Sequence, residues 1–233
     1  MRKCGKILVD VLDRLRSEIR PGMRTDELDM IMAEESEKRG VIPSFKDYRG
    51  FPANLCVSVN EEIVHGIPGE RVLEEGDIVS LDAGVTLDGF CTDAAITVGV
   101  GSISKEAEKL VSVTQGALKA AVAEAICGAR ICDISAAIQR CVEPNGFSVV
   151  REYTGHGVGR DLHEEPQIPN FVAGKGVRLR NGMTLAIEPM VNAGDWRTRV
   201  ADNKWTVLTA DGSLSAHFEH TIAITDGEAE ILA

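Results

Sequence analysis

The stretch from Asp82 to Asp93, with the sequence DAGVTLDGFCTD, begins and ends with an acid, and the spacing of these two residues suggests chemistry. Apolar runs at 78–81 and 94–98 flank it and turn residues stand at 87–89, which predicts a β-hairpin with one acid in each arm. Both acids could therefore face one pocket. Two such carboxylates repel each other, and a bound cation is the simplest remedy. The alternative is a surface hairpin whose acids are solvated.

Two more acids stand among apolar residues that read as strands. Glu188 lies near the end of MTLAIEPM, and Glu219 lies in AHFEHT, close to the C-terminus. Each acid alone could pair with an arginine. Four such acids in three separate strand-like segments fit a shared inward site better.

Histidines accompany these acids. Glycines on both sides of His156, in TGHGVG, allow a close backbone approach and leave the imidazole accessible, and His163 follows in LHEEP. His65 stands beside Gly and Pro in HGIP, a setting that is more often structural than catalytic. No role emerges for His217 and His220, which we interpret as structural.

Four amphipathic segments are predicted to be the helices that support these strands. Their ranges are 3–20, a helix N-capped by Thr25 and ending at Gly40, a helix capped by Ser104 and ending near Gly128, and 133–142. The latter two read as cover for a sheet. Two rounds of helices followed by strands indicate an internal duplication.

Between residues 41 and 51 the pattern is irregular, and Phe45, Tyr48 and Phe51 stand close together in a chain with only 4% aromatic residues. This segment is either a loop packed on the core or a wall of an apolar pocket. The next segment, 55–60, alternates as a strand does.

Composition excludes several classes of protein. A hydrophobic content of 44% and a charged content of 26% are ordinary for a soluble globular protein. The net charge of -11 argues against nucleic acid as the main partner. The six cysteines include no C-x-x-C pair, which argues against a zinc knuckle, and no run reaches the ~18 apolar residues of a membrane span. We expect a soluble, cytoplasmic protein with one domain over residues 1–233.

The motifs NEEIVHGIPG, SLDAGVTLDGFCTDAAIT, TGHGVGRDLHEEP, AIEPM and HFEHT, in this order, resemble the methionine aminopeptidases, closest to the bacterial type I form. The resemblance covers essentially the whole chain. It implies an α+β, pita-bread (creatinase/aminopeptidase-like) fold with pseudo-twofold halves and an antiparallel-rich curved sheet covered by helices.

The resemblance also implies a dinuclear metal site with five ligands, which are Asp82, Asp93, His156, Glu188 and Glu219. Four carboxylates balance the charge of two divalent cations. Four oxygen-donor side chains with one imidazole favour Mn, Fe(II) or Co over a thiolate zinc site. Two such ions lower the pKa of water that attacks the first peptide carbonyl, and Glu188 is the expected proton acceptor.

His65 and His163 match the two histidines of the family that are not ligands. The resemblance implies that His163 donates to the carbonyl oxygen as it becomes an oxyanion, while His65 contacts the backbone amide and the leaving nitrogen. This implication reverses the structural interpretation of His65. The side chains expected to bind the substrate methionine are Tyr48, Phe51, Cys56, Leu162 and Trp205, together with the two histidines, and Met190 lies near the floor.

Two positions depart from the family pattern. Leu162 stands where an aromatic residue is frequent, and Phe45 stands where a smaller residue, often Cys, is usual. These departures bear on the shape of the pocket more than on the reaction. A family-level monovalent cation near Asn60 and Ser215 is also implied.

The implied reaction is removal of the initiator methionine from nascent polypeptides, with a preference for a small second residue. We expect a monomer that associates transiently with the ribosome, without nucleic acid as substrate, without a membrane, and without an N-terminal extension of the eukaryotic kind. Two rivals share the fold: an X-Pro aminopeptidase or prolidase-like hydrolase, and a non-catalytic peptide-binding module. All five ligand positions and both histidines are present, which disfavours the second rival.

Overall fold

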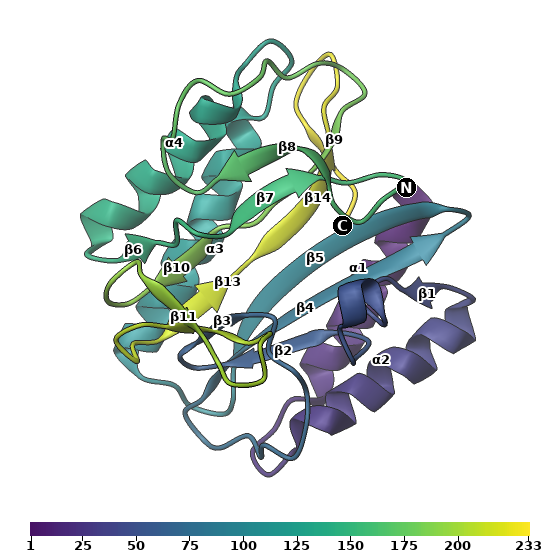
Figure 1. The fold of residues 1–233 in the computed structure, drawn as a ribbon, viewed down its shortest axis with the longest axis vertical. Helices are drawn as coiled ribbons and strands as arrows, with labels where there is room; N and C mark the ends of the chain where they lie inside the picture. The colour runs from purple at the N-terminus through teal and green to yellow at the C-terminus, as the bar shows by residue number, and fades with distance from the viewer.

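The computed structural model describes residues 1–233, and a nine-stranded antiparallel sheet runs through it (Figure 1). Seven strands follow one path in the order β1 (Ile42–Pro43), β4 (Ile78–Leu87), β5 (Phe90–Gly99), β14 (Glu219–Ala223), β9 (Thr184–Ile187), β7 (Thr154–Gly157) and β8 (Glu164–Pro169). Two more join beside it, β2 (Cys56–Val59) on β4 and β15 (Glu230–Ile231) on β14.

Two three-stranded sheets stand beside the large one. The first has the order β13 (Ser215–His217), β10 (Met190–Asn192) and β6 (Ser148–Val149), and the second has the order β11 (Thr198–Val200), β12 (Val207–Thr209) and β3 (Glu62–Val64). Short 3-10 turns lie at Tyr48–Gly50 and Glu143–Asn145. β13 leads through Phe218 directly into β14, so the small and large sheets share a continuous stretch of chain.

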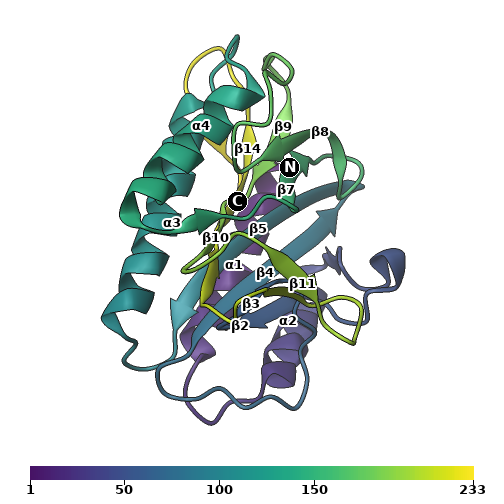
Figure 2. The ribbon, with the colours of Figure 1, turned by 60° about the vertical axis from the view of Figure 1, so that its left-hand side comes forward.

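Two pairs of helices cover one face of the large sheet, as Figures 1 and 2 show. The first pair is α1 (Arg2–Glu18) with α2 (Thr25–Arg39), and the second is α3 (Lys105–Glu124) with α4 (Ile131–Val142). Each pair encloses its own apolar core against different strands. The chain thus repeats a helix pair followed by strands, as the predicted pseudo-twofold halves require.

The alternation of side chains along β4 decides which face each residue occupies. Val79, Leu81 and Ala83 belong to the core beneath α1 and α2, so the residues between them point to the opposite face. Leu185 and Ile187 of β9 behave in the same way beneath α3 and α4. Asp82 is therefore on the face that the helices leave uncovered, and this face carries the candidate site.

The predicted hairpin is confirmed. β4 and β5 pair along their whole length, from Ile78 opposite Gly99 to Leu87 opposite Phe90. Asp88 and Gly89, the two turn residues, have φ of 52° and 75°, which is the left-handed conformation that such tight turns require.

Two details of the helices differ from the sequence-based prediction. Thr25 is the first residue of α2 rather than its N-cap, because its hydroxyl bonds to the backbone of Gly69 while the Glu27 carboxylate accepts from the N–H of Arg24. The helix capped by Ser104 ends at Glu124, four residues before Gly128. The loop that contains Gly128 pairs instead with the segment before β9, through a bond from Gly128 N–H to Leu179 O.

The two ends of the chain meet beside the large sheet (Figures 1 and 2). The buried C-terminal Ala233 packs in the core under α1. The first turn of that helix contains Gly5, whose N–H bonds to the carbonyl of Met1. None of the helices combines the length and the apolarity that crossing a membrane would demand.

The packing of α1 on the C-terminal segment predicts opposite effects of one substitution at two helical glycines. A Cβ at Gly5 would lie 1.9 Å from the carbonyl oxygen of Leu232, whereas a Cβ at Gly116 of α3 would meet only Cys141 Sγ at 3.7 Å. Replacing a helical glycine with alanine gains about 1 kcal/mol of helix propensity, and overpacking costs about 1–3 kcal/mol. Gly116→Ala should therefore raise the free energy of unfolding in urea, and Gly5→Ala should lower it. Equal effects at both sites would contradict the tight contact.

Candidate metal centre

Three of the four predicted acids meet around one small residue, Ala95 of β5. Ala95 pairs with Asp82 of β4 on one side and with Glu219 of β14 on the other. Residues directly opposite each other in an antiparallel pair share a face, and so do residues two apart in one strand. Asp93, two residues before Ala95, therefore points to the same side as Asp82 and Glu219.

The remaining two residues reach this side from the next two strands. Glu188 directly follows β9, and the register of β9 with β14, which pairs Ile187 with His220, places Glu188 opposite Glu219 when continued by one residue. His156 of β7 pairs with Ala186, two residues before Glu188. Five adjacent strands thus each contribute one of the five predicted ligands to one face.

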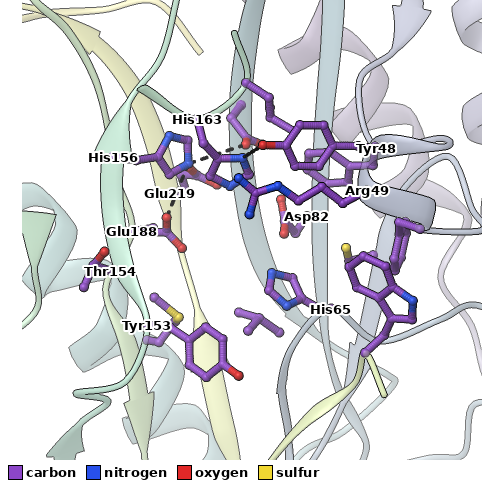
Figure 3. A pocket seen from close by; sticks show the side chains of 18 of the residues that line it. Tyr48, Arg49, His65, Asp82, Tyr153, Thr154, His156, His163, Glu188 and Glu219 are labelled. Carbon is purple, nitrogen blue, oxygen red and sulfur yellow. Dashed lines mark hydrogen bonds and ion pairs between the residues drawn. The ribbon is translucent and has the colours of Figure 1, made fainter. Parts of the chain in front are cut away.

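These side chains line a cavity of about 330 Å³, at the lower end of the range for small-molecule sites. Figure 3 shows the polar groups converging from several strands. All the residues that the sequence predicts for the site line this cavity: Tyr48, Phe51, Cys56, His65, Asp82, Asp93, His156, Leu162, His163, Glu188, Trp205 and Glu219. The structure therefore brings the predicted residues together without exception.

Burial of these acids changes their protonation. It raises the pKa of Asp82 and of Glu188 to about 7 and holds the pKa of Asp93 and of Glu219 well above the ordinary value, and the neighbouring carboxylates add to the rise at Asp93 and Glu219. No Lys or Arg forms an ion pair with any of the four, and only His156 and His217 approach them. The cluster therefore lacks the positive charge that would let all four acids ionise.

The donor atoms fit divalent metal. Asp93, His156 and Glu219 each offer one ligand atom, and these three atoms lie within 4.8 Å of one another. One oxygen each of Asp82, Asp93 and Glu219 is buried without a hydrogen-bond partner. Buried polar atoms are normally paired, so three unpaired carboxylate oxygens from residues that line one cavity indicate that a cation belongs there. Asp82 and Glu188 border this group and extend it in two directions (Figure 3).

The glycines that flank His156 serve strand packing. A Cβ at Gly155 would lie 2.5 Å from the carbonyl oxygen of Ala186, and one at Gly157 would lie 2.3 Å from that of Glu165. β7 is thus pressed between β9 and β8 more closely than other residues allow. The close approach expected from the glycines is therefore to the neighbouring strands, and it holds the imidazole of His156 beside the acids.

The two other predicted histidines have different partners. His163 Nδ1 lies 2.9 Å from the hydroxyl of Tyr48, the two rings stack at 5.2 Å, and the ring of His156 lies 4.2 Å away (Figure 3). His65 meets the edge of the Tyr153 ring at 5.8 Å, and burial lowers the pKa of His65 to about 4. His65 is thus neutral at physiological pH.

An apolar wall stands on the other side of the cavity. Phe45, Phe51, Ala53, Cys56 and Leu162 form one cluster, with Tyr48, Ile67 and Trp205 packed against it. Phe51 and Trp205 meet edge to face at 5.3 Å. The irregular segment at 41–51 is therefore a wall of an apolar pocket, the second of the two interpretations above. Burial also raises the pKa of the Cys56 thiol well above its usual value, so this sulfur is a neutral wall atom.

Some lining residues escaped the sequence analysis. They are Arg49, Val64, Glu152, Tyr153 and Thr154. Val64 directly precedes His65, and Tyr153 and Thr154 directly precede the glycine-flanked histidine, so their positions in the sequence could have indicated them. Glu152 carried no such signal, because only the folding of the loop before β7 brings it to the cavity.

Comparison with known proteins gives one consistent result. The model of metallopeptidase family M24 matches residues 1–226. The chain is 54% identical to the methionine aminopeptidase of Clostridium perfringens and 53% identical to methionine aminopeptidase 1 of Bacillus subtilis, in both cases over the whole chain and 94% of the relative.

Solved structures agree. The crystal structure of the methionine aminopeptidase from Thermotoga maritima matches with a TM-score of 0.98 and 50% identity, over 100% of this chain and 94% of that one. The Xaa-Pro dipeptidase from Bacillus anthracis matches with a TM-score of 0.81 and 23% identity, over 99% of this chain and 58% of that one, which shows the shared fold. The predicted α+β pita-bread fold is confirmed.

The raised pKa values predict how the stability of the metal-free protein depends on pH. Asp82 and Glu188 hold protons up to about pH 7 when folded, but release them near 3.8 and 4.5 when unfolded. The folded state therefore binds more protons in this window, and stability falls as pH rises from about 4.5 to 7.

Urea unfolding of chelator-treated protein should show this loss, and Asp82→Asn combined with Glu188→Gln should reduce it. The comparison is made between wild type and this double variant because the surface carboxylates act equally in both. Added Mn²⁺ should stabilise the wild type most at neutral pH. Identical pH dependence in wild type and double variant would contradict the assigned burial.

Proposed function

The chain belongs to metallopeptidase family M24, among the methionine aminopeptidases, and from this premise we propose that its buried carboxylate cluster holds the metal with which it removes N-terminal methionine from nascent proteins. The resemblance predicted from the five sequence motifs is thereby confirmed. The chain is a hydrolase of the metalloexopeptidase class that uses divalent metal.

One observation carries the proposal for the site. Five adjacent strands direct one side chain each to the same buried point, and three carboxylate oxygens there have no partner within the protein. Without a metal, four acids concentrated in this way would destabilise the folded protein, because each adds to the repulsion among the others. We assign Asp82, Asp93, His156, Glu188 and Glu219 as the ligands.

Charge and donor type support two ions of the harder kind. Four ionised carboxylates match the charge of two divalent cations, and four oxygen donors with one imidazole favour Mn, Fe(II) or Co. Asp93 and Glu219, the middle pair of acids on β5 and β14, would hold the metal together with Asp82, His156 and Glu188. Divalent ions at this point supply Lewis acidity, which lowers the pKa of water and polarises a peptide carbonyl.

The chain's own groups then bind, orient and move protons. Glu188, whose carboxylate lines the cavity beside the other acids, takes a proton from the attacking water and delivers it to the leaving amine. The tautomer that this role requires has the Tyr48 hydroxyl donating to His163 Nδ1 and the Nε2–H of His163 donating to the carbonyl oxygen as negative charge develops. His65, neutral and backed by Tyr153, contacts the peptide amide and the leaving nitrogen.

The apolar wall supports specificity for methionine. The aromatic and sulfur-bearing side chains of Tyr48, Phe51, Cys56 and Trp205 suit a flexible thioether, with Leu162 closing the same surface. Burying the methionine side chain contributes about 1.5–3 kcal/mol. The second residue of the substrate lies toward the mouth, where a bulky side chain would clash and a small one would fit.

Several expectations follow from the substrate. Because nascent chains are the proposed substrate, we expect the protein to act in the cytoplasm. Transient association with the ribosome stays a prediction. A monomer with a single catalytic domain over residues 1–233 also stays a prediction. The monovalent cation predicted near Asn60 and Ser215 also stays a prediction.

A short peptide panel tests the proposed activity. Purified protein supplied with Mn²⁺ or Co²⁺ should release free methionine from Met-Ala-Ser and leave Met-Lys-Ser uncut, because lysine is too large for the second position. Asp93→Asn should abolish release, since it removes one of the proposed ligands. Release of methionine can be followed by chromatography.

Three results would count against the proposal. If none of the divalent metals supports release of methionine, the proposed aminopeptidase activity is wrong. Cleavage of X-Pro peptides in place of Met-Ala-Ser would favour the prolidase-like rival. Full activity of Asp93→Asn would remove this residue from the metal site.

A further inference from the structure

His217 is the buried polar group for which the proposed reaction has no use. Its side chain lies on β13 and is only 1% exposed, and both ring nitrogens lack a hydrogen-bond partner. A buried imidazole with no partner is unfavourable, because it has given up its bonds to water without replacing them. We therefore expect this buried, unpartnered imidazole to have a function in the metal site beside it.

Its nearest charged neighbour is Glu188. His217 Nε2 lies 3.5 Å from Glu188 Oε2, while His156 Nε2 lies 3.6 Å from Glu188 Oε1, the approach drawn in Figure 3. The carboxylate therefore stands between two imidazoles, one at each oxygen. The distance to His217 is slightly longer than a hydrogen bond, and a small rotation of the ring or the carboxylate would close it.

The backbone of His217 is held firmly in place. Its N–H donates to Thr97 Oγ1 at 2.9 Å, and the same hydroxyl donates to the His217 carbonyl at 2.7 Å. On the other side, β13 pairs His217 with Met190, two residues after Glu188. The backbone of His217 is thus held between β5 and β10, with its side chain next to Glu188.

His220, three residues later, provides the contrast. Its Nδ1 bonds to the carbonyl of Ala233 at 2.8 Å, and it pairs with Ala94, a residue of the core beneath α1. His220 therefore faces away from the acids and has a partner. His217, two residues before Glu219, faces toward them and has none.

We propose that His217 is a positioning residue for Glu188. Its Nε2–H donates to Glu188 Oε2, which fixes the plane of the carboxylate and directs Oε1 toward His156 and the metal site. The inference rests on the ligand role proposed for Glu188. Such outer hydrogen bonds orient the ligands of a metal, and their loss typically weakens metal affinity or activity by about 10- to 100-fold.

Four variants separate positioning from packing. His217→Gln keeps an N–H donor near the position of Nε2, whereas His217→Leu has no donor and His217→Asn is too short to reach Glu188. His220→Gln is the matched control on the opposite face. For each variant, Mn²⁺ affinity is measured by calorimetry on chelator-treated protein, kcat and KM are measured on Met-Ala-Ser, and Tm is measured without metal.

The proposal predicts that His217→Leu and His217→Asn weaken Mn²⁺ binding and lower kcat by about 10- to 100-fold each, with KM unchanged. His217→Gln should restore both to near the wild-type values, and His220→Gln should change neither. If His217→Leu fails to fold, the comparison of His217→Gln with His217→Asn carries the test alone.

Wild-type Mn²⁺ affinity and kcat in both His217→Leu and His217→Asn would overturn the proposal. An equal loss in His217→Gln and His217→Asn would overturn it too, because the donor would then be irrelevant. The Mn²⁺ measurement keeps this test separate from the proposed function. If the wild type binds Mn²⁺ but releases no methionine, the aminopeptidase activity fails while the role of His217 is still decided by affinity.

Discussion

Four carboxylates buried at one point of a sheet repel one another, and this repulsion is the constraint to which the rest of the structure responds. Burial penalises each charge, and the absence of any lysine or arginine partner leaves only protons or metal cations to relieve it. The remainder of the fold keeps these acids in place despite that cost. Apolar cores beneath both helix pairs stabilise the sheet from its opposite face.

Register is the means by which distant residues are brought together. Asp82 and Glu219 are far apart in sequence, yet both pair with Ala95, and a slip of one residue in either ladder would turn an acid into an apolar core. The apolar residues that alternate with the acids prevent such a slip, because they would be exposed by it. The same pattern that builds the core therefore fixes the site.

The sequence contained much of this arrangement. The acids at either end of the DAGVTLDGFCTD hairpin and the glycine-flanked His156 were predictable because alternation and turn chemistry are local properties. The starts of the helices were less predictable. Thr25 has the side chain of an ordinary N-cap, but in the folded chain its hydroxyl bonds to the backbone of Gly69. His217 and His220 differ most clearly. They share one motif and look alike in sequence, but one faces the acids and the other faces α1, a distinction that depends on neighbouring strands.

We propose that two divalent ions take the place of the missing positive charge between these strands. X-ray diffraction from crystals grown with Mn²⁺, recorded at the manganese absorption edge, would locate such ions. We expect two anomalous peaks within coordination distance of Asp93 and Glu219. One should lie on the side of Asp82 and the other on the side of His156 and Glu188. No peak at these side chains, or peaks only at the protein surface, would contradict this proposal.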